Sequence, residues 1–252
     1  EGTGFPVGKV DELYIYPMSF QEFLLALDKD IMVNLINEHS WEETIPIHEK
    51  FVELLRQYYY TGGMPEVVKC YAKTGDLGKV RSLQNAILKG YMRDISKHAS
   101  KEEVNRIHAV WENLPSQLAR ENKKFIYGAL KKGARAKEYE KALQWLIDSG
   151  LVIKVNKVNQ TVLPLKFYED YSAFKLFVLD LGLLGAMSDV PAKDILVGSN
   201  IFSEYKGAFT EQFTAQQLYS ENHNLFYYTN ENSTLEIDFV LQQEDIYLIE
   251  VK

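Results

Sequence analysis

The C-terminal segment carries four charged side chains of the types that bind metal ions and phosphate groups. They are Glu236, Asp238, Glu250 and Lys252. These residues alternate with apolar residues in the segments 236–242 and 246–252, and this alternation predicts two β-strands. With a turn at 243–245, the resulting hairpin places Asp238 opposite Glu250 and Glu236 opposite Lys252 on its open face. Two opposed carboxylates repel each other, so we expect a cation between them.

A divalent cation at this position would allow phosphodiester hydrolysis. Carboxylate oxygens suit Mg²⁺, and a bound Mg²⁺ polarises a phosphate and acidifies a bound water molecule. Lys252 follows Glu250 by two residues, so it shares the same face and can stabilise charge on the phosphoryl oxygens. We therefore predict Asp238, Glu250 and Lys252 as catalytic residues. The alternative is that they are ordinary solvated charges on the open face of a hairpin.

A third carboxylate is predicted to join this site from a helix. The segment 203–220 has helical periodicity, and Glu211 falls on its mainly apolar flank, where a carboxylate needs a partner. We predict Glu211, Asp238 and Glu250 as the ligands of one Mg²⁺ ion. Without the metal, repulsion among them is expected to raise the pKa of at least one.

The composition indicates an ordinary globular chain. It has 252 residues, of which 46% are hydrophobic and 25% charged, with a formal net charge of −7 and a single cysteine, Cys70. One cysteine excludes an internal disulfide, and no apolar run is long enough to span a bilayer. These features favour a cytoplasmic location without a membrane partner. The segment 2–10 resembles a phosphate-binding loop but lacks its glycine and hydroxyl spacing, so we expect no ATP binding there.

The N-terminal half is predicted to be helical. A strand at 10–16 precedes helices at 20–27, 31–38 and 46–60, a short helix that begins at Pro65, and helices at 76–98 and 101–112, with capping boxes at Ser19 and Ser100. Pro115 either interrupts the last of these helices or starts the next turn. A strand at 174–179, a short helix at 182–187 and a linker at 191–199 lead to the C-terminal part.

The middle of the chain is basic. Residues 123–157 include nine basic and three acidic side chains. A helix at 134–148, a strand at 151–155 and a return strand near 161–167 predict a winged helix, which can enter a DNA groove. The predicted phosphate contacts are Lys131, Lys132, Arg135, Lys137 and Lys141. Glu138 and Glu140 in the same helix oppose DNA binding, and winged helices also dock other proteins.

Motifs spread over the chain together resemble one protein family. They include YPMSFQEFL at 16–24, GGMPE at 62–66, LQWLIDSGL at 143–151, YEDYSAFK at 168–175, EIDF at 236–239 and EVK at 250–252. They are similar to motifs of bacterial and archaeal AAA-type ATPases that carry a C-terminal domain of unknown function, DUF4143. The C-terminal part also resembles the PD-(D/E)XK nuclease superfamily.

The resemblance implies a division into three parts. Residues 1–60 would end an AAA-type ATPase module, with the ATP-binding motifs, ATP hydrolysis and any oligomerisation belonging to a segment before Glu1. Residues 61–190 would contain the winged helix at about 100–170, and 191–252 would be a truncated nuclease-like domain. Two departures from the nuclease pattern are Ile237 in place of a proline before Asp238, and the lack of a helix and strand after Lys252.

The expected fold class is therefore α+β, with a mainly helical N-terminal half, a winged helix in the middle and a C-terminal α/β core like that of restriction endonucleases. Three functions remain open. They are Mg²⁺-dependent DNA cleavage, DNA binding without cleavage, and a protein-docking surface that regulates the upstream ATPase.

Overall fold

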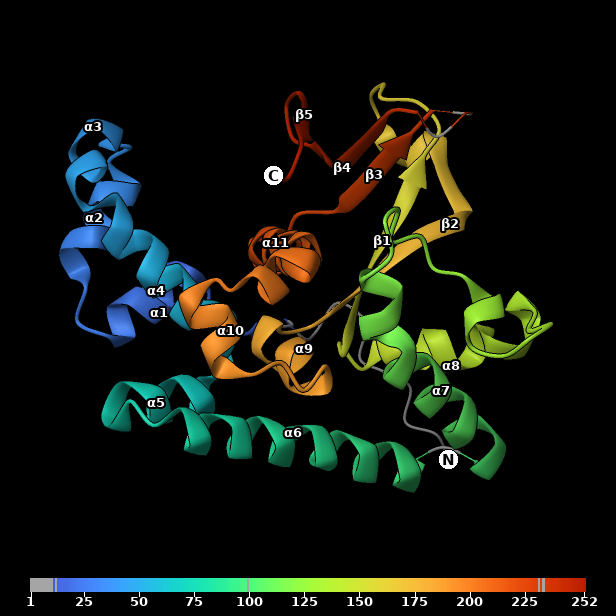
Figure 1. The fold of residues 1–252 in the computed structure, drawn as a ribbon. Helices are drawn as coiled ribbons and strands as arrows, with labels where there is room; N and C mark the ends of the chain where they lie inside the picture. Colours follow the sequence, from blue (N-terminus) through green and yellow to red (C-terminus); the bar gives the residue numbers. More distant parts are fainter. Residues whose placement is uncertain (1–10, 12, 99, 231, 233) are drawn as a thin grey trace.

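The computed structural model describes residues 11, 13–98, 100–230, 232 and 234–252. Helices dominate the N-terminal region and a five-stranded mixed sheet follows, so the predicted α+β class is confirmed (Figure 1). The first helices are α1 (Phe20–Ala26), α2 (Asp30–Asn37), α3 (Trp41–Thr44), η1 (Ile45–Ile47), α4 (His48–Thr61), α5 (Pro65–Thr74) and α6 (Leu77–His98). The later ones are α7 (Lys101–Leu118), η2 (Tyr127–Ala129), α8 (Ala136–Asp148), η3 (Leu165–Tyr168), α9 (Leu181–Met187), α10 (Ala192–Val197) and α11 (Asn200–Ser220).

Two helices begin at the predicted capping boxes. The Ser19 hydroxyl accepts a hydrogen bond from the Glu22 amide at 3.2 Å, and the Glu22 carboxylate accepts one from the Ser19 amide at 2.7 Å. Ser100 and Glu103 form the same reciprocal pair at the start of α7. Each box satisfies amides that have no partner within the helix, which explains why α1 and α7 begin where they do.

Three predictions about the helical region are wrong. Residues 13–16 form no strand, because no strand among the described residues lies beside them, and the Met18 amide that follows donates to the Gly63 carbonyl. Helix α7 continues through Pro115, since Leu114 and Leu118 on either side are buried and their packing offsets the lost hydrogen bond. The predicted linker contains α10, which buries Ile195. The segment 2–10 lies outside the described residues.

The sheet has the strand order β2-β1-β3-β4-β5. Its strands are β1 (Val152–Val158), β2 (Glu169–Val178), β3 (Leu225–Thr229), β4 (Glu236–Gln242) and β5 (Ile246–Ile249). β1 runs parallel to β3, and the other neighbouring pairs are antiparallel. The strands of the basic middle region thus share one sheet with the C-terminal strands, across the boundary predicted near residue 191 (Figure 1).

The strand that pairs with β1 is not the predicted one. Residues 165–168 form η3, and the return strand is β2, in which Val178 pairs with Val152 and Phe174 with Asn156. Pro164 has no amide to donate to a ladder, which disfavours the earlier segment. Residues 173–178 are all buried, so the later segment makes a strand covered on both faces.

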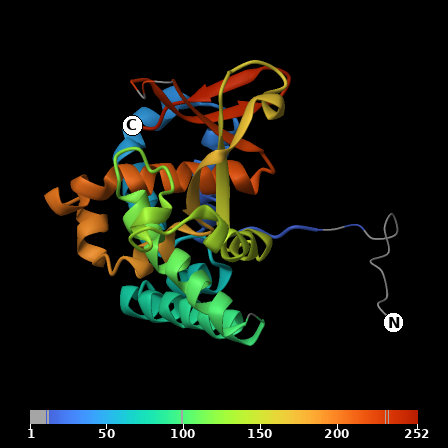
Figure 2. The ribbon, with the colours of Figure 1, turned by 90° about the vertical axis from the view of Figure 1, so that its right-hand side faces the viewer.

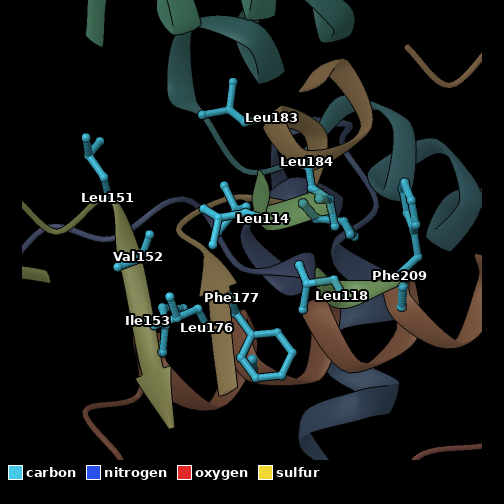
Figure 3. Close-up of a cluster of buried hydrophobic side chains, with 14 of the residues drawn as sticks. Leu114, Leu118, Leu151, Val152, Ile153, Leu176, Phe177, Leu183, Leu184 and Phe209 are labelled. Atoms are coloured by element: carbon cyan, nitrogen blue, oxygen red, sulfur yellow. The ribbon is translucent and has the colours of Figure 1, made fainter. Parts of the chain in front are cut away.

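Helix α11 runs across one face of the sheet (Figure 2). Its Gln212 side chain donates to the Val178 carbonyl at 2.5 Å and accepts from the Val178 amide at 2.9 Å, as a neighbouring strand would. Leu118 of α7, Leu184 of α9 and Phe209 of α11 contribute to the same core as Phe177 of β2 (Figure 3). The α11 face of the sheet is therefore largely sealed from solvent.

None of the helices among the described residues combines the length and the apolar character that a membrane-spanning helix needs.

The N-terminal helices are joined to this core at the turn after α4. Gly62 ends the helix with a φ of 72°, and the Gly63 amide donates to a carboxylate oxygen of Asp180 at 2.6 Å. The Gly63 carbonyl accepts from the Met18 amide at 2.7 Å. A methyl group on Gly63 would overlap the Met18 backbone, so only glycine allows this close approach.

Gly63→Ala is therefore expected to destabilise the protein, by about 1–3 kcal/mol, because the backbone of Met18 or Gly63 must move. Gly90→Ala is the matched control: Gly90 lies within α6 with open space around it, so the same change should stabilise the helix by about 0.5–1 kcal/mol. Urea unfolding of the two variants measures both effects. Equal effects of the two changes would contradict the packing described at Gly63.

Candidate functional site

The predicted register of the C-terminal hairpin is confirmed. Phe239 pairs with Ile249 and Gln242 with Ile246, which leaves 243–245 as the turn. Strand β5 ends at Ile249, so Glu250 and Lys252 follow the ladder and are not part of it. Their side chains are 66% and 83% exposed and approach each other to 3.8 Å.

A bulge in β4 changes the side of the sheet that its charged residues face. Phe226 of β3 pairs with Val240 and Tyr228 with Ile237, so β4 has one extra residue between these pairs. As a result Ile237 packs beside Val240, whereas Phe239 belongs to the main core. The prediction that the charges lie on an open face is wrong for Glu236 and Asp238, whose partners are on the α11 side.

The partner of both carboxylates is Lys175 of β2, whose side chain is completely buried. Its ammonium lies 2.5 Å from Glu236, 3.8 Å from Asp238 and 3.4 Å from Glu211 of α11. It also lies 5.1 Å from the centre of the Tyr227 ring on β3. The sheet and α11 are thus joined by one buried cation and three carboxylates.

Lys123 completes the charged cluster from the loop after α7. Its ammonium is 2.5 Å from the other oxygen of Glu211, and its side chain is only 11% exposed. We call Lys123, Lys175, Glu211, Glu236 and Asp238 the buried charge cluster. The Asp238 carboxylate also accepts the Val251 amide at 2.8 Å, which attaches the segment after β5 to the cluster.

Burial and charge act in opposite directions on the cluster's pKa values. Burial raises the pKa of Glu211, although the ammonium groups of Lys175 and Lys123 partly counteract it. Burial lowers the pKa of Lys175, but the carboxylates of Glu211, Glu236 and Asp238 outweigh it and leave the pKa above its usual value. Lys175 is therefore charged at neutral pH. The pKa of Glu211 is raised, but its main cause is burial and not the repulsion among three carboxylates that the sequence led us to expect.

The predicted metal ligands are only partly brought together. Glu211 and Asp238 both approach the Lys175 ammonium, so their oxygens are no further apart than the sum of those two distances. Glu250 is exposed and next to Lys252. Among the residues described, no group of three or more His, Cys, Asp or Glu side chains is arranged to hold a metal ion. As placed here, the side chains do not fit Mg²⁺, because an ammonium lies among the carboxylates.

The sequence analysis missed Lys175, although the sequence contains a signal for it. Lys175 is the one charged residue in the segment 174–179, which is otherwise apolar and predicted to be a strand. A lysine in such a strand needs a buried acidic partner. The corresponding signal for the acidic partner was Glu211, a carboxylate on a mainly apolar helix flank for which the sequence showed no partner.

The predicted DNA-binding residues lie on the segment before α8 and on its first turns. Lys131, Lys132, Arg135, Lys137 and Lys141 all have exposed side chains. In the part of the chain that the structure describes, none of these five forms an ion pair within 4.0 Å. The apolar face of α8 is buried through Tyr139, Ala142, Leu143 and Leu146, so helix packing directs the basic residues outward.

A polar cavity of about 440 Å³ adjoins the buried charge cluster. It is lined by Glu121, Asn122, Lys124, Lys157, Tyr227, Thr229, Asn230 and Glu236. Glu236 and Tyr227 line the cavity and also contact Lys175, since Glu236 pairs with the Lys175 ammonium and the Tyr227 ring lies beside that ammonium. The cavity wall carries two cationic side chains, Lys124 and Lys157, and two carboxylates, Glu121 and Glu236, so its charges balance.

A second buried acidic residue, Asp180, was also missed. It is fully buried at the start of α9, where its carboxylate accepts the Leu183 amide at 2.9 Å and the Gly63 amide at 2.6 Å. The Gln216 amide group lies 3.4 Å away and also donates to the Tyr58 hydroxyl. Burial raises the pKa of Asp180 to about 6, against the lowering effect of these hydrogen bonds.

This raised pKa makes stability depend on pH in a defined direction. Between about pH 4 and 6 the unfolded chain loses the Asp180 proton before the folded protein does, so the free energy of unfolding falls as pH rises. The shift from 3.8 to about 6 corresponds to a loss of about 3 kcal/mol at most. Asp180→Asn removes this contribution. The free energy of unfolding of the wild type minus that of the variant should therefore decrease as the pH rises over that interval. Urea titrations from pH 4 to 7 measure it, and a pH-independent difference would contradict it.

The fold and site define an α+β protein with a buried charge cluster between a mixed sheet and one helix. Comparison with family models matches residues 52–194 to the domain of unknown function DUF8612, and the chain belongs to this family. Residues 206–252 match the domain of unknown function DUF4143, which confirms that part of the resemblance. No AAA-type ATPase or nuclease family model matches. No curated protein and no solved structure matches.

Proposed function

We propose that this chain is a DNA-binding region that acts together with an upstream ATPase module of the AAA type. The observation that carries the proposal is the run of five exposed cations from Lys131 to Lys141, which have no ion pair among the described residues. Cations that are not held in ion pairs are available to neutralise DNA phosphates, and of the five only Lys141 lies near enough to a carboxylate among the described residues, that of Glu103, to lower its pKa. ATP would belong to the upstream module, as would any oligomerisation.

The order of elements around these cations supports the same proposal. The elements follow one another in the order of a winged helix. They are helix α7, a short bridge between Lys124 and Lys175, η2, α8 and the β1–β2 pair. In that arrangement α8 is the helix that enters the major groove. Glu138 and Glu140 are also exposed on α8, so contact with phosphates is favoured over a deep approach to the bases.

We expect duplex DNA to bind with an affinity that falls steeply with salt. The triple change Lys131→Ala, Lys132→Ala and Arg135→Ala should reduce the slope of log K against log salt by up to about three, because each lost contact leaves one phosphate unneutralised. Fluorescence anisotropy over a salt series measures this slope. The triple change of Lys69, Lys73 and Lys89 to Ala alters the net charge equally at exposed sites elsewhere, and it should leave the slope unchanged. Equal effects of the two variants would contradict the proposed surface.

Mg²⁺-dependent DNA cleavage by Asp238, Glu250 and Lys252 is the second candidate. The confirmed hairpin register and the approach of Glu211 to Asp238 favour it. It requires a rearrangement, because Glu250 points to solvent and Lys175 lies among the carboxylates. A protein-docking role for the same surface is the remaining alternative, and it requires neither metal nor DNA.

The cleavage candidate predicts that the whole protein degrades single- or double-stranded DNA with Mn²⁺ and not with EDTA. Asp238→Asn should reduce this activity to the EDTA level, because it removes a charged ligand from the site. Asp245→Asn makes the same chemical change in the exposed turn of the hairpin and should have no effect. Activity that survives in Asp238→Asn would rule out this site as its source, and circular dichroism would show whether each variant is folded.

A further inference from the structure

We infer that Lys175 is a built-in cation of the buried charge cluster and takes the place expected for a divalent metal ion. This inference concerns the site of the cleavage candidate but does not depend on any activity. Its starting point is the mismatch between the predicted ligands and their observed surroundings. Two of the three predicted ligands, Glu211 and Asp238, face an ammonium group instead of a metal ion.

The geometry around Lys175 meets the requirements of a buried ammonium. Such a group has three protons to donate, and leaving it without acceptors in a dry interior is costly. Glu211, Glu236 and Asp238 supply carboxylates from α11 and β4, at 3.4, 2.5 and 3.8 Å. The lysine side chain is 0% exposed, so water contributes little and these three groups are its principal partners.

Lys175 also connects parts of the sheet that are not neighbours. It belongs to β2, while Glu236 and Asp238 belong to β4, and β1 and β3 lie between those strands. The side chain passes the Tyr227 ring of β3 on the way. The same pairing therefore holds β2, β4 and α11 together, a structural task that in other proteins a bound metal ion performs.

The charge balance of the cluster explains why a metal ion and Lys175 exclude each other. Among the described residues, three carboxylates face two ammonium groups, those of Lys175 and Lys123. A divalent cation among these carboxylates would lie within a few ångströms of the Lys175 ammonium and be repelled by it. Metal can bind there only if the lysine charge is removed or moved away.

The experiment measures Mn²⁺ binding and thermal unfolding of the wild type and of Lys175→Met, without nucleic acid. Methionine matches the lysine side chain as far as Cε and removes the ammonium group with its charge. Lys175→Met should unfold at a lower temperature without metal, because Glu236 and Asp238 then lose the ammonium they share and Glu211 keeps only that of Lys123. It should bind Mn²⁺ at least about tenfold more tightly than the wild type, which equals about 1.4 kcal/mol. Mn²⁺ should raise its unfolding temperature and leave that of the wild type unchanged at matched ionic strength.

Lys124→Met is the matched control, because Lys124 forms a backbone bridge with Lys175 but its exposed side chain belongs to the cavity wall. It should behave as the wild type. If Lys175→Met does not fold, the double variant Lys175→Met/Glu236→Gln should recover stability, since among the described residues Glu236 pairs with no ammonium except that of Lys175. A double variant that also fails to fold would overturn the inference, because Lys175 would then be needed for more than its charge.

Tight Mn²⁺ binding by the wild type that Asp238→Asn abolishes would also overturn the inference. That result would support the cleavage candidate, so failure of the built-in cation and failure of the cleavage candidate give different results. Conversely, a wild type that neither binds Mn²⁺ nor cleaves DNA, together with a Lys175→Met variant that gains metal binding, supports the built-in cation and removes the cleavage candidate.

Discussion

A charged group inside a protein must be surrounded by groups of opposite charge, and the arrangement of this chain depends on meeting that condition at Lys175. Three carboxylates from α11 and β4 approach its ammonium. Because those elements are separate in the sequence, the ion pairs of the Lys175 ammonium fix how α11 crosses the sheet. They also fix the side of the sheet to which β4 directs Glu236 and Asp238. The bulge in β4 serves the same requirement, since it lets Glu236 and Phe239 reach the same side of the sheet.

Asp180 has a comparable role further along α11, where the Gln216 side chain donates to it. Its carboxylate receives the Gly63 amide from the N-terminal helices and the Leu183 amide from α9. The main hydrophobic core extends from Phe23 in α1 to Leu241 in β4, so the helical region and the sheet share one interior. Polar side chains buried inside that core select one relative placement of the elements, because any other would leave them without partners.

The two groups of basic side chains differ in what they can do. Lys123 and Lys175 are committed to internal carboxylates, and their charges are used in holding the fold together. The cations of α8 and the segment before it face solvent and are directed outward by the buried side of the helix. External anions can reach the second group and not the first.

The sequence by itself determined the local features of this protein. Alternation in 236–249 was enough for the hairpin and its register, since a shift of one residue would exchange its two faces. The capping residues predicted where α1 and α7 start. The position of Glu211 on an apolar helix flank predicted that it lies near Asp238. Only the tertiary structure decided that β2 is the partner of β1, that β4 has a bulge, and that Lys175 lies among the carboxylates. Periodicity reports how a residue is oriented relative to its chain neighbours, whereas these three features depend on which distant segments pack together, and that choice is made by the burial of the whole core.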